Sequence, residues 1–184
     1  MGKVLVGLTM SLDGFINDRN GSVERLYPDL GALRNTELLQ DSIQRTGAVV
    51  MGRRAYAMGE PDAYAGAYEY QVPIFVLTHA APATLPAENE RLRFTFVTDG
   101  IESAIWQARA AAGDKDITVI GGASTAQQCI QARLLDELHI GIVPVFLGGG
   151  LRPFDGIEME HVELEQLQVI ESPSRTDLKF RVVK

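Results

Sequence analysis

The stretch ITVIGGASTAQQCIQARLLDELHI, residues 117–140, decides the fold of this chain. Its β-branched residues end at Gly121 and Gly122, and a pattern of helical spacing follows, which is typical of a strand that leads into a helix. The glycines permit a close backbone approach, and we expect Ser124 or Thr125 to cap the helix. Free N–H groups at such a helix start suit a phosphate or pyrophosphate. A plain tight turn is the alternative, because neither G-x-G-x-x-G nor G-x-x-x-x-G-K-[ST] is present.

Short apolar runs of strand length recur along the chain. Several are apolar on both faces, as the buried strands of a largely parallel sheet are. They occupy residues 3–9, 48–52, 74–78, 93–98, 117–121 and 137–148. Helical patterns over about 35–46 and from near Gly100 separate them, and HVELEQLQVIES with TDLKFRVVK predicts a closing antiparallel hairpin. The sequence therefore predicts one α/β domain over residues 1–184, with a mixed, mostly parallel sheet flanked by helices.

Helix caps can be predicted at two places. Asn35 or Thr36 is available to cap the first of these helices. Asp99 and Glu102 have the spacing of a capping box at the start of the second.

Composition excludes several classes of function. The net charge of −7 and the scattered Lys and Arg residues speak against a nucleic-acid partner, and no apolar stretch is long enough for a membrane helix. The N-terminus matches a first strand better than a signal peptide, so we expect a cytoplasmic protein. Cys129 is the only cysteine and falls on the apolar face of a helix, where we expect it in the core. Without H-E-x-x-H, G-x-S-x-G or a Cys/His cluster, no metal site is expected.

Three further segments carry candidate functional residues. In AVVMGRRAY a buried strand ends at Gly52 and leads to Arg53 and Arg54. Their planar guanidinium groups match phosphate, and the alternative is that both arginines are only solvated side chains at the rim of the sheet. In GLTMSLDGFIND, Asp13 either caps a turn or faces a ligand at a strand end. In LHIGIVPVFLGGGLRPF, Pro144 predicts an edge strand or a bulge. The three glycines that follow form a flexible turn or allow a flat ring to approach.

The three histidines give weaker signals. His79 directly follows a predicted strand and is the one that we consider for ligand contact. His139 is expected in the core or at a sheet edge, and His161 is expected to be exposed at the start of the final hairpin.

Five segments in this order resemble the dihydrofolate reductase-like superfamily. They are SLDGFI (11–16), VVMGRRAY (49–56), VLT (76–78), IGGAST (120–125) and LLDELHIGIVPVFLGGGLRPF (134–154). The likeness extends over nearly the whole chain and is most specific for the branch that contains the reductase domain of bacterial riboflavin biosynthesis. It implies a single-domain dihydrofolate reductase-like fold that binds NADPH across the strand ends.

The resemblance also implies roles for individual residues. The expected cofactor contacts are Gly121, Gly122, Ala123, Ser124 and Thr125 at the pyrophosphate, Gly52, Arg53 and Arg54 at the adenosine side with Arg53 on the 2′-phosphate, Thr78 and His79 at the adenine ribose, and Leu8, Thr9, Ile16 and Asn17 at the nicotinamide. Asp13 and Phe154 are expected to contact the substrate. Asp13 and Glu37 are the expected catalytic carboxylates, because a proton must reach the substrate.

The sequence also departs from these relatives. Ile120 stands where the riboflavin-pathway reductases usually carry a glutamate, and their zinc-dependent deaminase half is absent. The leading hypothesis is an NADPH-dependent reductase of a small heteroaromatic or carbonyl substrate, such as a pyrimidine or a pterin. A dinucleotide-binding module with little turnover and a purely structural domain are the alternatives. Relatives in this family suggest a homodimer formed through residues 137–147 and the C-terminal hairpin.

Overall fold

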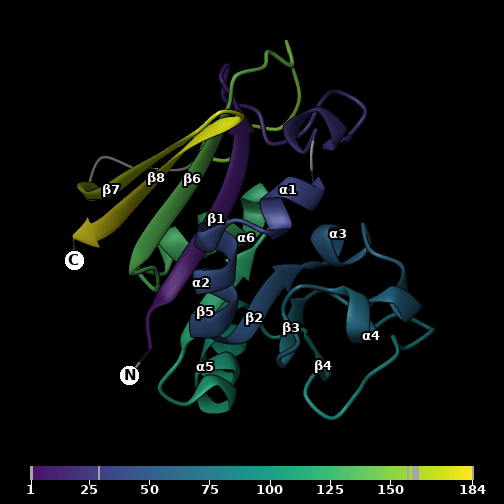
Figure 1. Cartoon of the computed structure of the whole chain (residues 1–184). Helices are drawn as coiled ribbons and strands as arrows, with labels where there is room; N and C mark the ends of the chain where they lie inside the picture. The colour runs from purple at the N-terminus through teal and green to yellow at the C-terminus, as the bar shows by residue number, and fades with distance from the viewer. Residues whose placement is uncertain (1, 29, 157, 159–161, 184) are drawn as a thin grey trace.

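The computed structural model describes residues 2–28, 30–156, 158 and 162–183, and its centre is one eight-stranded sheet (Figure 1). The strands are β1 (Val4–Ser11), β2 (Thr46–Gly52), β3 (Ile74–Leu77), β4 (Phe94–Val97), β5 (Asp116–Ile120), β6 (Glu137–Val143), β7 (Glu163–Ser172) and β8 (Arg175–Val183). Their spatial order is β4-β3-β2-β5-β1-β6-β8-β7. The first six run parallel, while β8 is antiparallel to both β6 and β7. The predicted mixed, mostly parallel sheet with a closing hairpin is confirmed.

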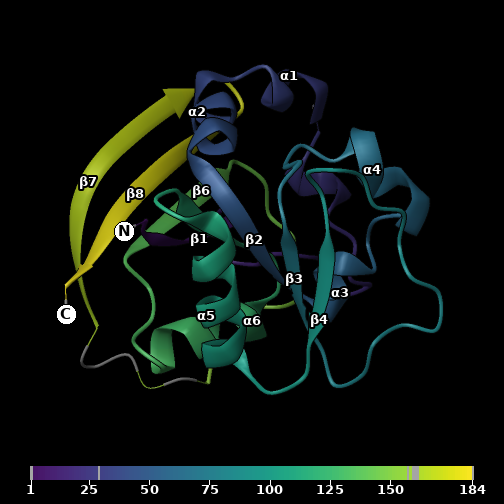
Figure 2. The ribbon, with the colours of Figure 1, turned by 90° about the horizontal axis from the view of Figure 1, so that it is seen from below.

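Helices cover both faces of the sheet. The longer ones are α2 (Glu37–Arg45), α5 (Ile101–Ala112) and α6 (Ala123–Gln131), and the shorter ones are α1 (Leu30–Arg34), α3 (Arg53–Tyr56), α4 (Tyr64–Ala67) and the 3-10 turns Glu24–Leu26 and Pro61–Ala63. Figure 2 shows α2 on one face and α5 with α6 on the other. This arrangement leaves the ends of the parallel strands free to carry a site.

Two apolar clusters hold these layers together. Buried residues of α5 and α6, including Ile105, Ala108 and Cys129, pack against one face of β1, β2, β5 and β6. On the other face, Leu39 and Ile43 of α2 join a second cluster that includes three buried tyrosines. Burial raises the pKa of the Cys129 thiol to about 12, so this side chain is an inert core residue, as predicted.

The structure confirms one local prediction and corrects two others. Thr36 does cap α2, because its Oγ1 accepts a hydrogen bond from the Leu39 N–H at 3.3 Å. The capping box at α5 is wrong, since Gly100 is the N-cap and no side chain bonds there. The expectation that Pro144 marks an edge or a bulge is also wrong. Strand β6 is interior, between β1 and β8, and it ends at Val143, just before the residue that lacks an N–H.

The polar face of β6 carries His139. This half-buried histidine lies on an interior strand and contacts Glu137 Oε2 through Nε2 at 3.0 Å, so it belongs neither to an edge strand nor to the apolar core. His161 lies outside the described residues.

Two features are absent from the part of the chain that the structure describes. No helix there has the length and apolarity that crossing a membrane requires. The same residues include no cluster of three or more His, Cys, Asp or Glu side chains that could hold a metal ion.

Candidate active site at the carboxyl ends of the strands

The sheet order places most of the predicted cofactor contacts along one edge. In the β-sheet register Gly52 pairs with Leu77 of β3, and its predecessor Met51 pairs with Ile120 of β5. Ile120 also pairs with Gly7 of β1 on its other side. The carboxyl ends of four neighbouring strands therefore lie in a row. In the order of the sheet, these ends carry Thr78 and His79 after β3, Gly52 with Arg53 and Arg54 at β2, Gly121 and Gly122 after β5, and Leu8 and Thr9 on β1. Ligands of open α/β sheets bind at this carboxyl edge.

Two glycines let the loops after β2 and β5 touch each other. A Cβ atom on Gly121 would lie 2.6 Å from the Ala55 Cβ, and a Cβ on Gly52 would lie 2.6 Å from the Thr125 Oγ1. Gly121 also has a φ of +72°, which side chains rarely adopt. Both positions therefore require glycine, and we call this closely packed junction, where α3 and α6 begin, the glycine cradle.

The start of α6 is not capped by a side chain. Gly122 is the N-cap, with a φ of +62°, so the prediction that Ser124 or Thr125 caps this helix is wrong. The Ser124 Oγ instead accepts a hydrogen bond from the Gln128 Nε2 at 3.1 Å, while Thr125 and Ala123 are buried. The first N–H groups of α6 thus remain available to an anion at the positive end of the helix dipole.

The two arginines lie beside this cradle. Arg53 and Arg54 begin α3, are exposed, and have no side-chain hydrogen bond or ion pair to any residue that the structure describes. Their guanidinium groups are therefore free to bind an anion. His79 is exposed as well. The Thr78 hydroxyl donates a hydrogen bond to the Ala80 carbonyl at 2.8 Å, so this side chain stabilises the turn that follows β3.

Asp13 joins two loops. Its Oδ1 accepts the Leu147 N–H at 3.0 Å, and its Oδ2 accepts the Gly148 N–H at 2.8 Å. Together with the Ser11 hydroxyl, which has the largest effect, these hydrogen bonds lower the pKa of Asp13 to about 2. The carboxylate is therefore ionised near neutral pH and positions the loop after β6. Its predicted catalytic and substrate-binding roles remain predictions.

The loop after β1 and the three glycines after β6 pack against each other. Asn17 Oδ1 accepts the Leu151 N–H at 2.8 Å, and the Ile16 N–H donates to the Leu151 carbonyl at 2.9 Å. A Cβ on Gly150 would lie 1.9 Å from the Asn17 carbonyl oxygen. The close approach that the glycines permit is thus to this neighbouring loop. Ile16 and Asn17 lie beyond β1, next to the strand end that carries Leu8 and Thr9.

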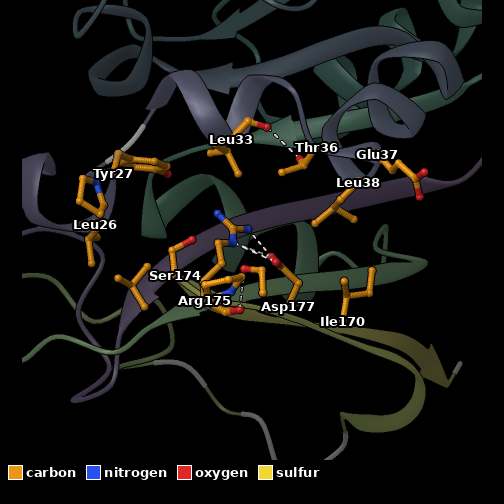
Figure 3. Close-up of a pocket in the computed structure, with 14 residues that line it drawn as sticks. Leu26, Tyr27, Leu33, Thr36, Glu37, Leu38, Ile170, Ser174, Arg175 and Asp177 are labelled. Atoms are coloured by element: carbon orange, nitrogen blue, oxygen red, sulfur yellow. Dashed lines mark hydrogen bonds and ion pairs between the residues drawn. The ribbon is translucent and has the colours of Figure 1, made fainter.

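A cavity of about 420 Å³ opens on the face of the sheet that α2 covers. It lies between the segment that leads into α2 and the strands β6, β7 and β8 (Figure 3). Its walls are mostly apolar, and its lining includes Tyr27, Thr36, Glu37, Arg175 and Asp177. A cavity of this size, with few polar groups, is typical of a small-molecule site.

The predicted substrate residues meet this cavity unequally. Glu37 lines it, although its carboxylate is turned away from the Arg175–Asp177 pair in Figure 3. Asp13 is not among the lining residues. Phe154 packs against the core on the α5 and α6 side and is not part of the lining either, so the structure does not bring it to this cavity.

Arg175 and Asp177 were not predicted as site residues from the sequence. The Arg175 Nε donates to both carboxylate oxygens of Asp177 at 2.9 Å, and its Nη1 lies 3.4 Å from the Thr9 Oγ1. The available signal was the alternation in SRTDLKF, which places Arg175 and Asp177 on the face opposite Leu178 and Phe180. That pattern is also typical of an exposed strand face, and only the tertiary structure shows that α2 partly covers it.

Comparison with known proteins supports the fold. The family model described as the RibD C-terminal domain matches residues 2–177. A putative riboflavin biosynthesis protein from Shewanella sp. PV-4 has a similar structure, with a TM-score of 0.79, 21% identity and 99% of both chains covered.

Two more distant structures share the fold. A diaminohydroxyphosphoribosylaminopyrimidine deaminase/5-amino-6-(5-phosphoribosylamino)uracil reductase from Thermotoga maritima gives a TM-score of 0.69 at 14% identity, over 99% of this chain and 57% of that one. Dihydrofolate reductase from Enterococcus faecalis, complexed with NADP(H) and RAB-propyl, gives 0.62 at 13% identity, over 100% of this chain and 98% of that one.

Proposed function

Because this chain belongs to the RibD C-terminal domain family, whose relatives include NADP(H)-dependent reductases, we propose that it is itself an NADPH-dependent reductase of a small heteroaromatic or carbonyl substrate. One observation carries the proposal. A line of cofactor-suited groups along the carboxyl edge of the sheet leads from the free arginines, past the glycine cradle, to a cavity beside β1.

The residues along this edge fit NADPH group by group. Arg53 and Arg54 offer unpaired guanidinium groups to the 2′-phosphate, for which a planar fork of donors is well suited. Next along the edge, the cradle at Gly121 and the free N–H groups of α6 suit the pyrophosphate. The strand end with Leu8 and Thr9 comes last, where the nicotinamide would lie. This spatial order matches the chemical order of the groups in the dinucleotide.

When bound, NADPH would supply the hydride, so the chain itself needs to supply position and shelter. Thr9 links the two parts of the site, since it lies at the proposed nicotinamide end and its Oγ1 approaches Arg175 in the cavity wall. Beside it, the loop after β1 and the loop after β6 are held together by Asp13 and Asn17. These contacts hold one wall of the site in a fixed position.

The proton that accompanies hydride transfer must come from a donor in or near the site. Asp13 is ionised near neutral pH and both of its oxygens accept backbone N–H groups, so it is a poor proton donor. Glu37 is exposed and lines the cavity, which supports its expected role as the group that exchanges a proton with solvent. We expect a pyrimidine or a pterin as the substrate. Ile120 stands where the riboflavin-pathway reductases usually carry a glutamate, so the substrate of those enzymes is not transferred to this chain.

The poor fit of Asp13 as a proton donor favours a second candidate, a dinucleotide-binding module with little turnover. Stopped-flow measurement of NADPH absorbance separates the two. We expect the signal to decay with 5-amino-6-(5-phosphoribosylamino)uracil, dihydrofolate or related compounds with an electron-poor C=N or C=O group as hydride acceptors. NADPH binding without oxidation across that panel would favour the module. The absence of NADPH binding would refute both candidates and leave a structural domain.

A further inference from the structure

We propose that Arg175, held in place by Asp177, is the residue that selects the substrate, and that the substrate is a planar lactam-type heterocycle without a phosphate group. The inference rests on the proposed function, because it assumes that the cavity beside Thr9 is where the substrate binds. Four features of the cavity carry it, namely the orientation of the guanidinium, its unused donors, the balance of charge and the position of the pair.

The guanidinium of Arg175 is fixed by its surroundings. Its Nε contacts both oxygens of Asp177 at 2.9 Å, and its Nη2 also bonds to Asp177. A Cβ on Gly141 of β6 would lie 2.4 Å from that Nη2 and 2.6 Å from Cζ, so the group rests against a backbone position that only glycine leaves free. Only 14% of the Arg175 side chain and 10% of the Asp177 side chain are exposed. Such an orientation is preorganised before any ligand binds.

Part of the hydrogen-bonding capacity of this pair remains unused. Arginine has five N–H groups. Within the described residues, Asp177 takes the Nε proton and one Nη2 proton, and Thr9 takes one Nη1 proton, which leaves one proton on each Nη. Asp177 has further lone pairs beside them. Adjacent donors and acceptors of this kind complement the neighbouring C=O and N–H groups of a ring lactam.

The charge of the cavity disfavours a phosphate. Among the lining residues that the structure describes, Arg175 is the only cation, and its charge is balanced by Asp177, while Glu37 adds a negative charge. Phosphate sites in proteins typically combine several cations or a free helix start. The start of α2 lines this cavity, but the Thr36 side chain caps it and Glu37 places a negative charge in its first turn. The remaining walls are apolar side chains such as Leu26, Leu33 and Ile170, which suit the faces of a flat ring.

The Arg175–Asp177 pair also lies close to the expected position of the nicotinamide. Arg175 Nη1 lies 3.4 Å from the Oγ1 of Thr9, the residue expected beside the nicotinamide. A ring bound to Arg175 would therefore lie next to the position from which a hydride is delivered. The guanidinium would hold the ring carbonyl and so fix which ring atom faces the cofactor.

The test is equilibrium binding of defined probes to the full chain. Lumazine provides a lactam ring without phosphate, and the aminopyrimidine 5-amino-6-ribosylaminouracil is compared with its 5′-phosphate. NADPH affinity is measured in the same samples by fluorescence. Arg175→Lys keeps the charge but removes the planar group, and Gly141→Ala displaces the guanidinium without changing it. Arg181→Lys is the matched control, because Arg181 lies on the same strand and its ion pair with Glu165 is exposed.

We expect Arg175→Lys and Gly141→Ala each to weaken lumazine binding on the order of tenfold or more, while NADPH affinity changes less than about twofold. Arg181→Lys should leave both unchanged. The wild type should bind the dephosphorylated pyrimidine at least as tightly as the phosphorylated one. Unchanged lumazine binding in Arg175→Lys, or a clear preference for the phosphate, would overturn the inference while leaving the reductase proposal intact. Failure of the wild type to bind NADPH would instead overturn the reductase proposal, whatever lumazine does.

Discussion

Asp13 shows how a residue's chemistry depends on its hydrogen bonds. A carboxylate at a strand end is predicted from SLDG, yet the structure shows both of its oxygens occupied by the N–H groups of Leu147 and Gly148. We predict that Asp13→Asn lowers the rate of hydride transfer severalfold, because the loop after β6 loses an ionised acceptor. The shape of the pH–rate profile should not change, because the pKa of Asp13 is about 2. If Asp13→Asn removes a limb of that profile near neutral pH, Asp13 is the proton donor after all.

His139 gives the fold a pH dependence that can be derived from its surroundings. Burial lowers its pKa below 6.5, and nearby Lys179 and Arg45 act in the same direction against the opposing effect of Glu137. The folded state therefore keeps His139 neutral, while the unfolded chain takes up a proton as the pH falls through 6.5. Glu137, whose pKa is lowered from 4.5 by Lys3 and His139 despite its burial, adds a loss of stability at more acidic pH. Stability is thus full above the unfolded His pKa and is lost on acidification.

The measurement is the urea midpoint at about pH 7.5 and about pH 5.5 for the wild type and for His139→Gln. We expect the wild type to lose more stability between the two pH values than the variant, because glutamine cannot be protonated. Equal losses in both proteins would show that other groups cause the pH dependence.

At the scale of the elements, sequence periodicity was sufficient to predict the strands but not to predict where the elements begin and end. Every predicted strand is present, because buried parallel strands leave long apolar runs. The end of β6 and the caps of α5 and α6 were wrong, since positive φ angles at Gly100 and Gly122 replace side-chain caps. Of the glycine pair, Gly121 makes the close backbone approach that the sequence permits, and the neighbour that it approaches, Ala55 of α3, follows from the strand order and not from the local sequence.

The role of Gly121 in the cradle can be tested against a glycine that also has a positive φ angle. Gly121→Ala places a methyl group 2.6 Å from the Ala55 Cβ, whereas Gly113→Ala, at a φ of +62°, meets nothing within 4 Å. Both variants should lose roughly 1–2 kcal/mol of unfolding free energy or somewhat more from the positive φ. NADPH binding, measured by fluorescence titration, should weaken only in Gly121→Ala. Equal NADPH affinities in the two variants would place the pyrophosphate elsewhere.

The whole molecule supplies what the sequence could not. The cavity combines side chains from the segment before α2 with Arg175 and Asp177 near the C-terminus, more than a hundred residues apart in the chain. Likewise, the Asp13 contact with Leu147 joins strand ends that are neighbours only in the folded sheet. Single-sequence patterns describe local periodicity, so such long-range contacts became predictable only where the resemblance to a family supplied the fold. The resemblance assigned cofactor roles to residues along the carboxyl edge in this way, and these roles stay predictions, whereas it assigned no role to Arg175 and Asp177.

The central claim is that NADPH lies along the carboxyl edge with its 2′-phosphate on Arg53. The most direct measurement is the ratio of the dissociation constants for NADH and NADPH in the wild type, Arg53→Ala and the control Arg91→Ala, which removes an exposed arginine just before β4 at the opposite edge. We predict that Arg53→Ala weakens NADPH binding by about 1.5–3 kcal/mol, with little effect on NADH, and that Arg91→Ala changes neither. An unchanged ratio in Arg53→Ala would contradict the claim.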